Sequence, residues 1–156
     1  MHYAMRRQDR ELTTEDAQQI LAGGTYGVLA INGGAEPAYA VPLSYVYQND
    51  AIYLHCAQEG RKLELIRQNG QASFCVVAEA EPLKDAFSMK YKSAIAFGTV
   101  SEISGEEKLP VLEAFIEKYA TDEEYLMKGK KYAAQAQDKT TVLKLDIRQL
   151  SAKVRK

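Results

Sequence analysis

Two cations and a glycine open a helix in the middle of the chain, directly after a strand. The strand ends at Cys56, a short loop follows, and the helix predicted over residues 60–69 begins Gly60-Arg61-Lys62. A helix start offers unpaired backbone N–H groups and the positive end of the helix dipole, so it binds anions such as phosphate. Arginine adds a planar fork that can hold two phosphate oxygens. The spacing favours a phosphate site; the alternative is an exposed first turn that merely carries two cations.

A proline lies in the strand predicted over residues 37–47. Pro42 has no N–H to donate to a sheet, so the strand must lie at an edge or contain a bulge at this point. Backbone groups on one side are then free, and a flat heteroaromatic ring can bind against them. The sequence leaves equally open an edge strand that binds no ligand.

A histidine stands at the end of the strand that precedes the proposed phosphate site. His55 is one of two histidines in the chain. A titratable imidazole at this position can donate a proton to a substrate that receives hydride or electrons, which would make His55 catalytic. The alternative is a half-buried histidine that hydrogen-bonds to a carbonyl group. The sequence gives the two interpretations equal weight.

Most other chemistries find no support in the sequence. Two histidines and two cysteines at distant positions do not supply four zinc ligands, so we expect no metal site. Cys56 and Cys75 fit buried apolar thiols better than redox partners. A net charge of −1 argues against nucleic acid as a partner, and no apolar run approaches the ~20 residues that span a membrane. The first residues lack the apolar stretch of a secretory signal, which predicts a cytoplasmic protein.

The elements that must position these residues are mainly strands. Residues 1–156 form one predicted domain with six strands, over residues 25–32, 37–47, 51–56, 72–78, 91–103 and 143–148. Further helices are predicted over residues 13–23, from near Glu106 to Tyr119, and over residues 122–137. Most strands are joined by hairpin-length connections, whereas a parallel sheet needs helical crossovers. We therefore expect a mainly β (α+β) fold, an antiparallel barrel with peripheral helices.

Three details of this barrel are also predicted. The strand over residues 72–78 is apolar apart from Ser73, which predicts a central strand that is buried on both faces. Gly98, inside a long strand, indicates a bulge or a barrel corner. The basic tail over residues 153–156 is expected to be a solvated end.

The order of these motifs resembles one known family along nearly the whole chain. The chain contains, in this order, a strand with Val-Pro-Leu-Ser, a strand ending in His55, the sequence Gly-Arg-Lys, and Tyr91-Lys92-Ser93 before Gly98. This order resembles that of the pyridoxamine 5'-phosphate oxidase-like FMN-binding split barrel. The opening segment, residues 5–12, resembles the nitroimidazole-resistance (Nim-type) branch of that family. The resemblance implies a six-stranded antiparallel split β-barrel.

The resemblance also implies which residues hold the cofactor, FMN, with FAD as the second candidate. Arg61 and Lys62 would grip the phosphate, where Gly60 replaces a serine of the oxidases. The backbone of residues 41–44 would lie along the flavin ring, and Ser93 would contact the ring. The expected cofactor-binding set is Val41, Pro42, Leu43, Ser44, His55, Cys56, Ala57, Gly60, Arg61, Lys62 and Ser93.

The function that the resemblance implies is a flavin-dependent oxidoreductase. It would be a homodimer with two flavin sites at the subunit boundary and would pass electrons from NAD(P)H to a small acceptor, with nitroaromatic compounds as candidates. Tyr39 and Ser44 stand where the oxidases usually carry Arg and Lys, and the arginine-rich C-terminal segment of those enzymes is missing, which argues against vitamin B6 synthesis. The alternative is a flavin- or haem-binding module without catalysis, since a fold does not fix a function.

Overall fold

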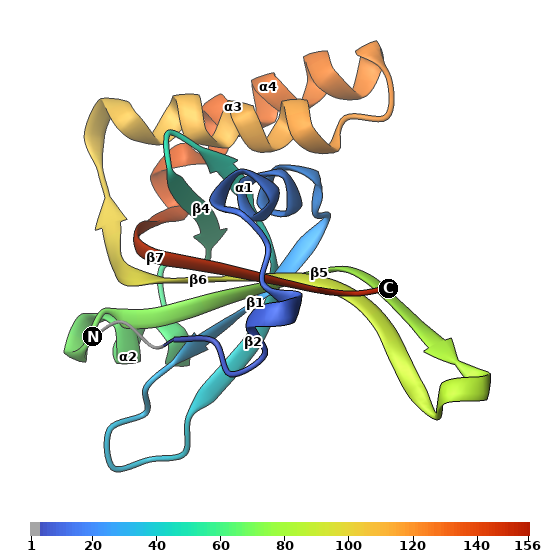
Figure 1. Cartoon of the computed structure of the whole chain (residues 1–156). Coiled ribbons are helices and arrows are strands. Elements are labelled where there is room, and N and C mark those ends of the chain that lie inside the picture. Colours follow the sequence, from blue (N-terminus) through green and yellow to red (C-terminus); the bar gives the residue numbers. More distant parts are fainter. Residues whose placement is uncertain (1–3) are drawn as a thin grey trace.

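The computed structural model describes residues 4–156 and shows one antiparallel sheet curled into a split barrel (Figure 1). The sheet has seven strands in the order β2-β1-β5-β6-β7-β4-β3. The strands are β1 (Tyr26–Ile31), β2 (Tyr39–Ser44), β3 (Val46–Gln48), β4 (Ala51–Cys56), β5 (Gln71–Leu83), β6 (Ser88–Ile103) and β7 (Thr141–Arg155). The antiparallel barrel predicted from the sequence is confirmed.

The helices lie at the periphery of this barrel. They are α1 (Thr14–Gly23), α2 (Arg61–Gln68), α3 (Lys108–Tyr119) and α4 (Glu123–Ala136), with short 3-10 turns η1 (Gln8–Arg10), η2 (Lys84–Ala86), η3 (Gly105–Glu107) and η4 (Gln137–Lys139). In Figure 1, α3 and α4 run together along one side of the sheet, and the hairpin between β5 and β6 extends away from the body. Among residues 4–156, no helix has the length and apolar character needed to cross a bilayer.

The seventh strand arises because the predicted strand over residues 37–47 is broken at Tyr45. The N–H of Tyr45 donates to the hydroxyl of Tyr119 (3.0 Å), and its carbonyl accepts from the Nζ of Lys118 (2.8 Å). Both partners belong to α3, so a helix satisfies the backbone groups that a sheet ladder would otherwise use. The sequence prediction of six strands missed this corner because its cause lies far along the chain.

The strand β5 is buried on one face only, which corrects the expectation of burial on both faces. Phe74 and Val76 are fully buried, whereas Val77 is 58% exposed. The strand does lie inside the sheet, between β1 and β6, although β6 occupies the middle of the order. The apolar outer face of β5 is therefore left uncovered within one protomer.

The bulge predicted at Gly98 is confirmed, and the strands around it are longer than predicted. The register between β6 and β7 shifts between Phe97 and Gly98, and a Cβ at Gly98 would collide with the carbonyl of Asp146. The basic tail is not a solvated end, because β7 pairs with β6 as far as Arg155, which lies opposite Tyr91. The strict alternation that reveals a strand ends before this part of β7.

Two apolar clusters hold the helices against the sheet. The barrel interior takes α1 through Ile20 and Leu21 and takes α2 through Leu63, Leu65 and Ile66. A second cluster packs α3 on the outside of β3 and β4, with the residues Val46, Ala51, Tyr53, Val111, Leu112, Phe115, Ala133 and Val142. Both α2 and α3 are thus fixed next to the end of β4.

Candidate functional site

The start of α2 has the form of an anion-binding site. Gly60 is the residue before the helix, it has a positive φ of 133° that favours glycine, and it provides no capping side chain. Its carbonyl accepts from the N–H groups of Leu63 (3.0 Å) and Glu64 (3.3 Å). The first N–H groups of a helix have no partner within the helix. The N–H groups of Arg61 and Lys62 are therefore available to a ligand.

The two cations of this turn differ in their surroundings. Arg61 forms an ion pair with Glu64 (Nη1 to Oε2, 3.3 Å), and both side chains are largely exposed. An exposed pair of this kind is worth roughly 0.3–0.5 kcal/mol, so a bound anion competes with it easily. Within residues 4–156, Lys62 has no ion-pair partner. Its charge acts to lower the pKa of His55, and it opposes the burial that raises the pKa of Cys56. Lys62 therefore lies near the end of β4.

His55 lies at the surface end of β4 with one side of its ring packed. The imidazole meets Phe115 of α3 edge-on, with 4.6 Å between ring centroids. Burial, and secondly the charge of Lys62, lower the pKa of His55 below its ordinary value of 6.5. Both effects favour the neutral form of the imidazole. In the part of the chain that the structure describes, the His55 ring contacts Phe115 and forms no hydrogen bond to a carbonyl group.

The strand β2 lies at the edge of the sheet, as Pro42 predicts. It is the first strand in the order and pairs only with β1, where Pro42 lies opposite Val28. Val41 and Leu43 pack toward the barrel interior, whereas Pro42 and Ser44 are exposed. The backbone along the other side of β2 has no strand partner and is free to contact a ligand.

The helix α3 contacts both the end of β2 and the end of β4. Tyr119 of α3 binds the backbone of Tyr45, directly after β2, and its ring stacks with Phe115 at 6.3 Å. Phe115 in turn contacts His55 at 4.6 Å. The backbone directly after β2 and the ring of His55 are thus linked through Tyr119 and Phe115 of α3. Lys62, at the start of α2, acts on the same imidazole through its charge.

Sequence reasoning missed the contribution of α3 to the corner between β2 and β3. The Nζ of Lys118 lies 3.8 Å from the centre of the Tyr45 ring. Burial lowers the pKa of Lys118 to about 8. The available signal was the spacing of Phe115 and Tyr119, which places both on one face of a helix. Nothing local in the sequence identifies the strand corner that this face holds.

The remaining predicted site residues divide into two groups. Cys56 and Ala57 directly follow His55 and lie at the same turn, where burial raises the pKa of the half-buried Cys56 thiol. Ser93 lies near the other end of β6. It is ten residues before Ile103, which ends β6 close to the turn between β4 and α2. Ten residues of strand span roughly 33 Å, so within one protomer Ser93 is not brought to Arg61 and Lys62.

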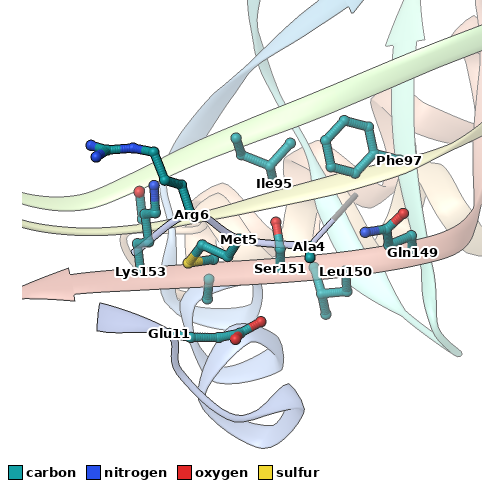
Figure 2. Close-up of a pocket in the computed structure, with 12 residues that line it drawn as sticks. Ala4, Met5, Arg6, Glu11, Ile95, Phe97, Gln149, Leu150, Ser151 and Lys153 are labelled. Carbon is teal, nitrogen blue, oxygen red and sulfur yellow. The ribbon is translucent and has the colours of Figure 1, made fainter. Parts of the chain in front are cut away.

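Ser93 instead lines a cavity of about 310 Å³ that sequence reasoning did not foresee (Figure 2). This cavity, named here the strap pocket, lies between residues 4–11 and the outer face of β6 and β7. It is lined by Ala4, Met5, Arg6, Glu11, Ser93, Ile95, Phe97, Gln149, Leu150, Ser151, Ala152 and Lys153.

Fold and site together define an antiparallel split barrel with a cationic helix start close to the end of β4. A family model described as pyridoxamine 5'-phosphate oxidase matches residues 13–154. The chain therefore belongs to the pyridoxamine 5'-phosphate oxidase family, as the order of its motifs predicted. Among curated proteins, none matches the sequence.

Solved structures share the fold over almost the whole chain. A candidate 5-nitroimidazole antibiotic resistance protein from Bacteroides thetaiotaomicron is 20% identical, with 98% of this chain and 96% of that chain covered and a TM-score of 0.75. An FAD-binding protein from Mesorhizobium loti is 20% identical, with coverage of 94% and 98% and a TM-score of 0.67. An FAD and haem binding protein from Mycobacterium smegmatis is 19% identical, with coverage of 94% and 74% and a TM-score of 0.70.

The electrostatic link between Lys62 and His55 can be tested directly. We expect Lys62→Met to raise the pKa of His55 toward 6.5, because one of the two causes of its lowering is removed. The imidazole proton signals in an NMR pH titration measure this, with His55→Gln identifying the signal. Because the folded pKa is lowered, the unfolded chain binds the proton more readily, so the free energy of unfolding falls as the pH drops below 6.5.

Lys131→Met on α4 is the matched control, since this lysine is exposed and lies on another helix. It should leave the titration of His55 unchanged. A His55 pKa that does not respond to Lys62→Met would show that the two side chains do not share one site.

Proposed function

We propose that this chain is a flavin-dependent oxidoreductase that works as a homodimer and passes electrons from NAD(P)H through FMN to a small acceptor. The observation that carries the proposal is the uncapped, cationic start of α2, where Lys62 lies close enough to His55 for its charge to help lower the pKa of the imidazole. Family membership and the similarity to an FAD-binding protein from Mesorhizobium loti support a flavin as the ligand.

The residues at the start of α2 and along β2 match the parts of FMN. The phosphate would accept from the N–H groups at the start of α2 and from Arg61 and Lys62. Gly60 leaves room for the phosphate, since no atom lies within 4 Å of where its Cβ would be. The ring would lie along the backbone of β2, residues 41–44. FAD carries a phosphate at the same place and remains the second candidate.

The protein's contribution beyond binding would be orientation and proton supply. A bound flavin supplies hydride and electron transfer, which no side chain of this chain provides. His55 would supply a proton to the acceptor: the neutral imidazole would take up a proton from the solvent, and the imidazolium so formed, made more acidic by the lowered pKa, would release it to the acceptor. The similarity to a candidate 5-nitroimidazole antibiotic resistance protein supports nitroaromatic compounds as acceptors.

The proposed dimer would form through the outer face of β1, β5 and β6. Large apolar side chains are exposed on this face, namely Tyr26 (63%), Val77 (58%) and Phe97 (38%). Contiguous apolar surface of this kind marks protein interfaces, and two-fold dimers are the commonest assembly. Ser93 lies on the same face of β6, beyond the reach of its own flavin. In the dimer it would contact the flavin of the other subunit, so each site would need both chains.

The second candidate is a module that binds a flavin or haem without catalysis. The similarity to an FAD and haem binding protein from Mycobacterium smegmatis favours it. Redox cycling separates this candidate from the enzyme, because both bind the cofactor and only the enzyme returns it to the oxidised form in step with a substrate.

A redox cycle is the first test of the proposed function. We expect the flavin-loaded protein to bleach with NADH or NADPH in the absence of oxygen and to regain its absorbance when a nitroaromatic acceptor is added. His55→Gln should slow the return of colour while leaving flavin bound, because it removes a proton donor and not a ligand of the phosphate. A protein that stays oxidised with both nicotinamides would be the binding module.

The phosphate assignment predicts a large loss of flavin affinity in the double variant Arg61→Ala, Lys62→Ala. Each charge-assisted hydrogen bond is worth ~1.5–3 kcal/mol, so the dissociation constant should rise by about 100-fold or more. Arg67→Ala is the matched control, because Arg67 lies at the other end of α2 and pairs with Glu102 at 2.7 Å. Equal flavin affinity in the double variant and the control, measured by fluorescence titration, would rule out this phosphate site.

The dimer predicts a particle of twice the 17.4 kDa chain mass in sedimentation analysis. Val77→Glu places a charge in the proposed interface and should yield monomers that also bind flavin more weakly, although Arg61 and Lys62 are intact. The control is Met127→Glu on α4, since Met127 is 70% exposed and lies outside the proposed interface. A wild-type protein that sediments as a monomer at all concentrations would contradict the shared site.

A further inference from the structure

Residues 4–12 form a strap that is anchored on β7 and reaches over the outer face of β6. The N–H of Leu12 donates to the carbonyl of Ala152 (3.0 Å), and Glu11 forms a backbone bridge with Lys153. Arg10 donates to the hydroxyl of Tyr91 at 3.3 Å. These contacts fix residues 10–12 on the sheet, and the residues before them, Ala4 to Arg6, line one side of the strap pocket.

The strap pocket has the size and the lining of a ligand site. Its volume of about 310 Å³ lies at the lower end of the range for small-molecule pockets, about 300–1,000 Å³. Ile95 and Phe97 give it an apolar side, and Ser93 and Ser151 add hydroxyl groups. A compound with one aromatic ring matches this combination.

The charges around the pocket are arranged at one end. Figure 2 shows Arg6 and Lys153 together at one end, Phe97 at the other, and the carboxylate of Glu11 below the β7 ribbon. Within residues 4–156, neither Arg6 nor Lys153 has an ion-pair partner, whereas Arg7 of the same strap pairs with Asp9. Two cations against one carboxylate leave a net positive charge at this end.

We propose that the strap pocket binds a small, flat aromatic carboxylate. Its carboxylate would lie between Arg6 and Lys153, because a guanidinium matches the two oxygens of a carboxylate. Its ring would pack against Ile95 and Phe97, where aromatic pairs gain from edge or offset contacts. In the proposed dimer Ser93 faces the flavin of the other subunit, so this ligand would also lie beside that flavin. This last statement rests on the proposed function, whereas binding to the pocket does not.

Two ligands that differ only in charge provide the test. Calorimetric titration with 4-nitrobenzoate and with 4-nitrobenzamide should show that the wild-type protein prefers the carboxylate. In the double variant Arg6→Gln, Lys153→Gln the affinity for 4-nitrobenzoate should fall at least about 10-fold, and that for 4-nitrobenzamide should stay the same. Arg148→Gln is the control, because Arg148 is exposed on β7 and does not line the pocket.

The titrations are made on protein with flavin and on protein from which flavin has been removed, with thermal unfolding of each variant as a check on folding. Loss of the carboxylate preference in the double variant alone supports the pocket in either preparation. Unchanged affinity for 4-nitrobenzoate in that variant, or no binding by the wild type, overturns the proposal. A protein that binds no flavin and still shows the charge-dependent binding would retain the pocket and refute the proposed function.

Discussion

The corner between β2 and β3 depends on how α3 binds the backbone at Tyr45. The N–H and carbonyl of this residue are satisfied by Tyr119 and Lys118, so the chain can leave one strand and begin the next without an unpaired buried group. The turn ends β2, whose second edge has no strand partner in the part of the chain that the structure describes. The same helix contacts His55 through Phe115. A change on this face of α3 therefore alters the corner after β2 and the packing of His55 together.

Charge at the start of α2 connects ligand binding with the state of His55. The positive end of the helix and the ammonium of Lys62 both favour an anion, and the ammonium also lowers the pKa of the imidazole. An anion bound at the helix start would offset this charge and make the imidazole easier to protonate. By linkage, protonation of His55 would strengthen binding of the anion by the same factor. In the proposed function, phosphate binding and proton supply would therefore be coupled through Lys62.

The parts of the fold that sequence predicted are those with a local physical cause. Pro42 cannot join a ladder on both sides, and Gly98 permits a close approach to a neighbouring strand, so an edge and a bulge follow from single residues. Gly60 before two cations likewise identifies the start of α2. The break at Tyr45 and the strap over β6 could not be predicted, because each depends on a partner more than 70 residues away in the chain.

The mistaken prediction for β5 and the remote position of Ser93 have one explanation in the proposed dimer. The apolar run over residues 72–78 has the composition of a strand buried on both faces, yet Val77 is 58% exposed in a single protomer. Sequence composition records whether a side chain avoids water and does not record which chain covers it. If a second copy covers this face, the composition of β5 is accounted for. Ser93 on the neighbouring strand would then contact the flavin bound at α2 of the other subunit, since the flavin at its own α2 is too distant. One dimer interface would then both bury the apolar outer face of β5 and bring Ser93 to the flavin site.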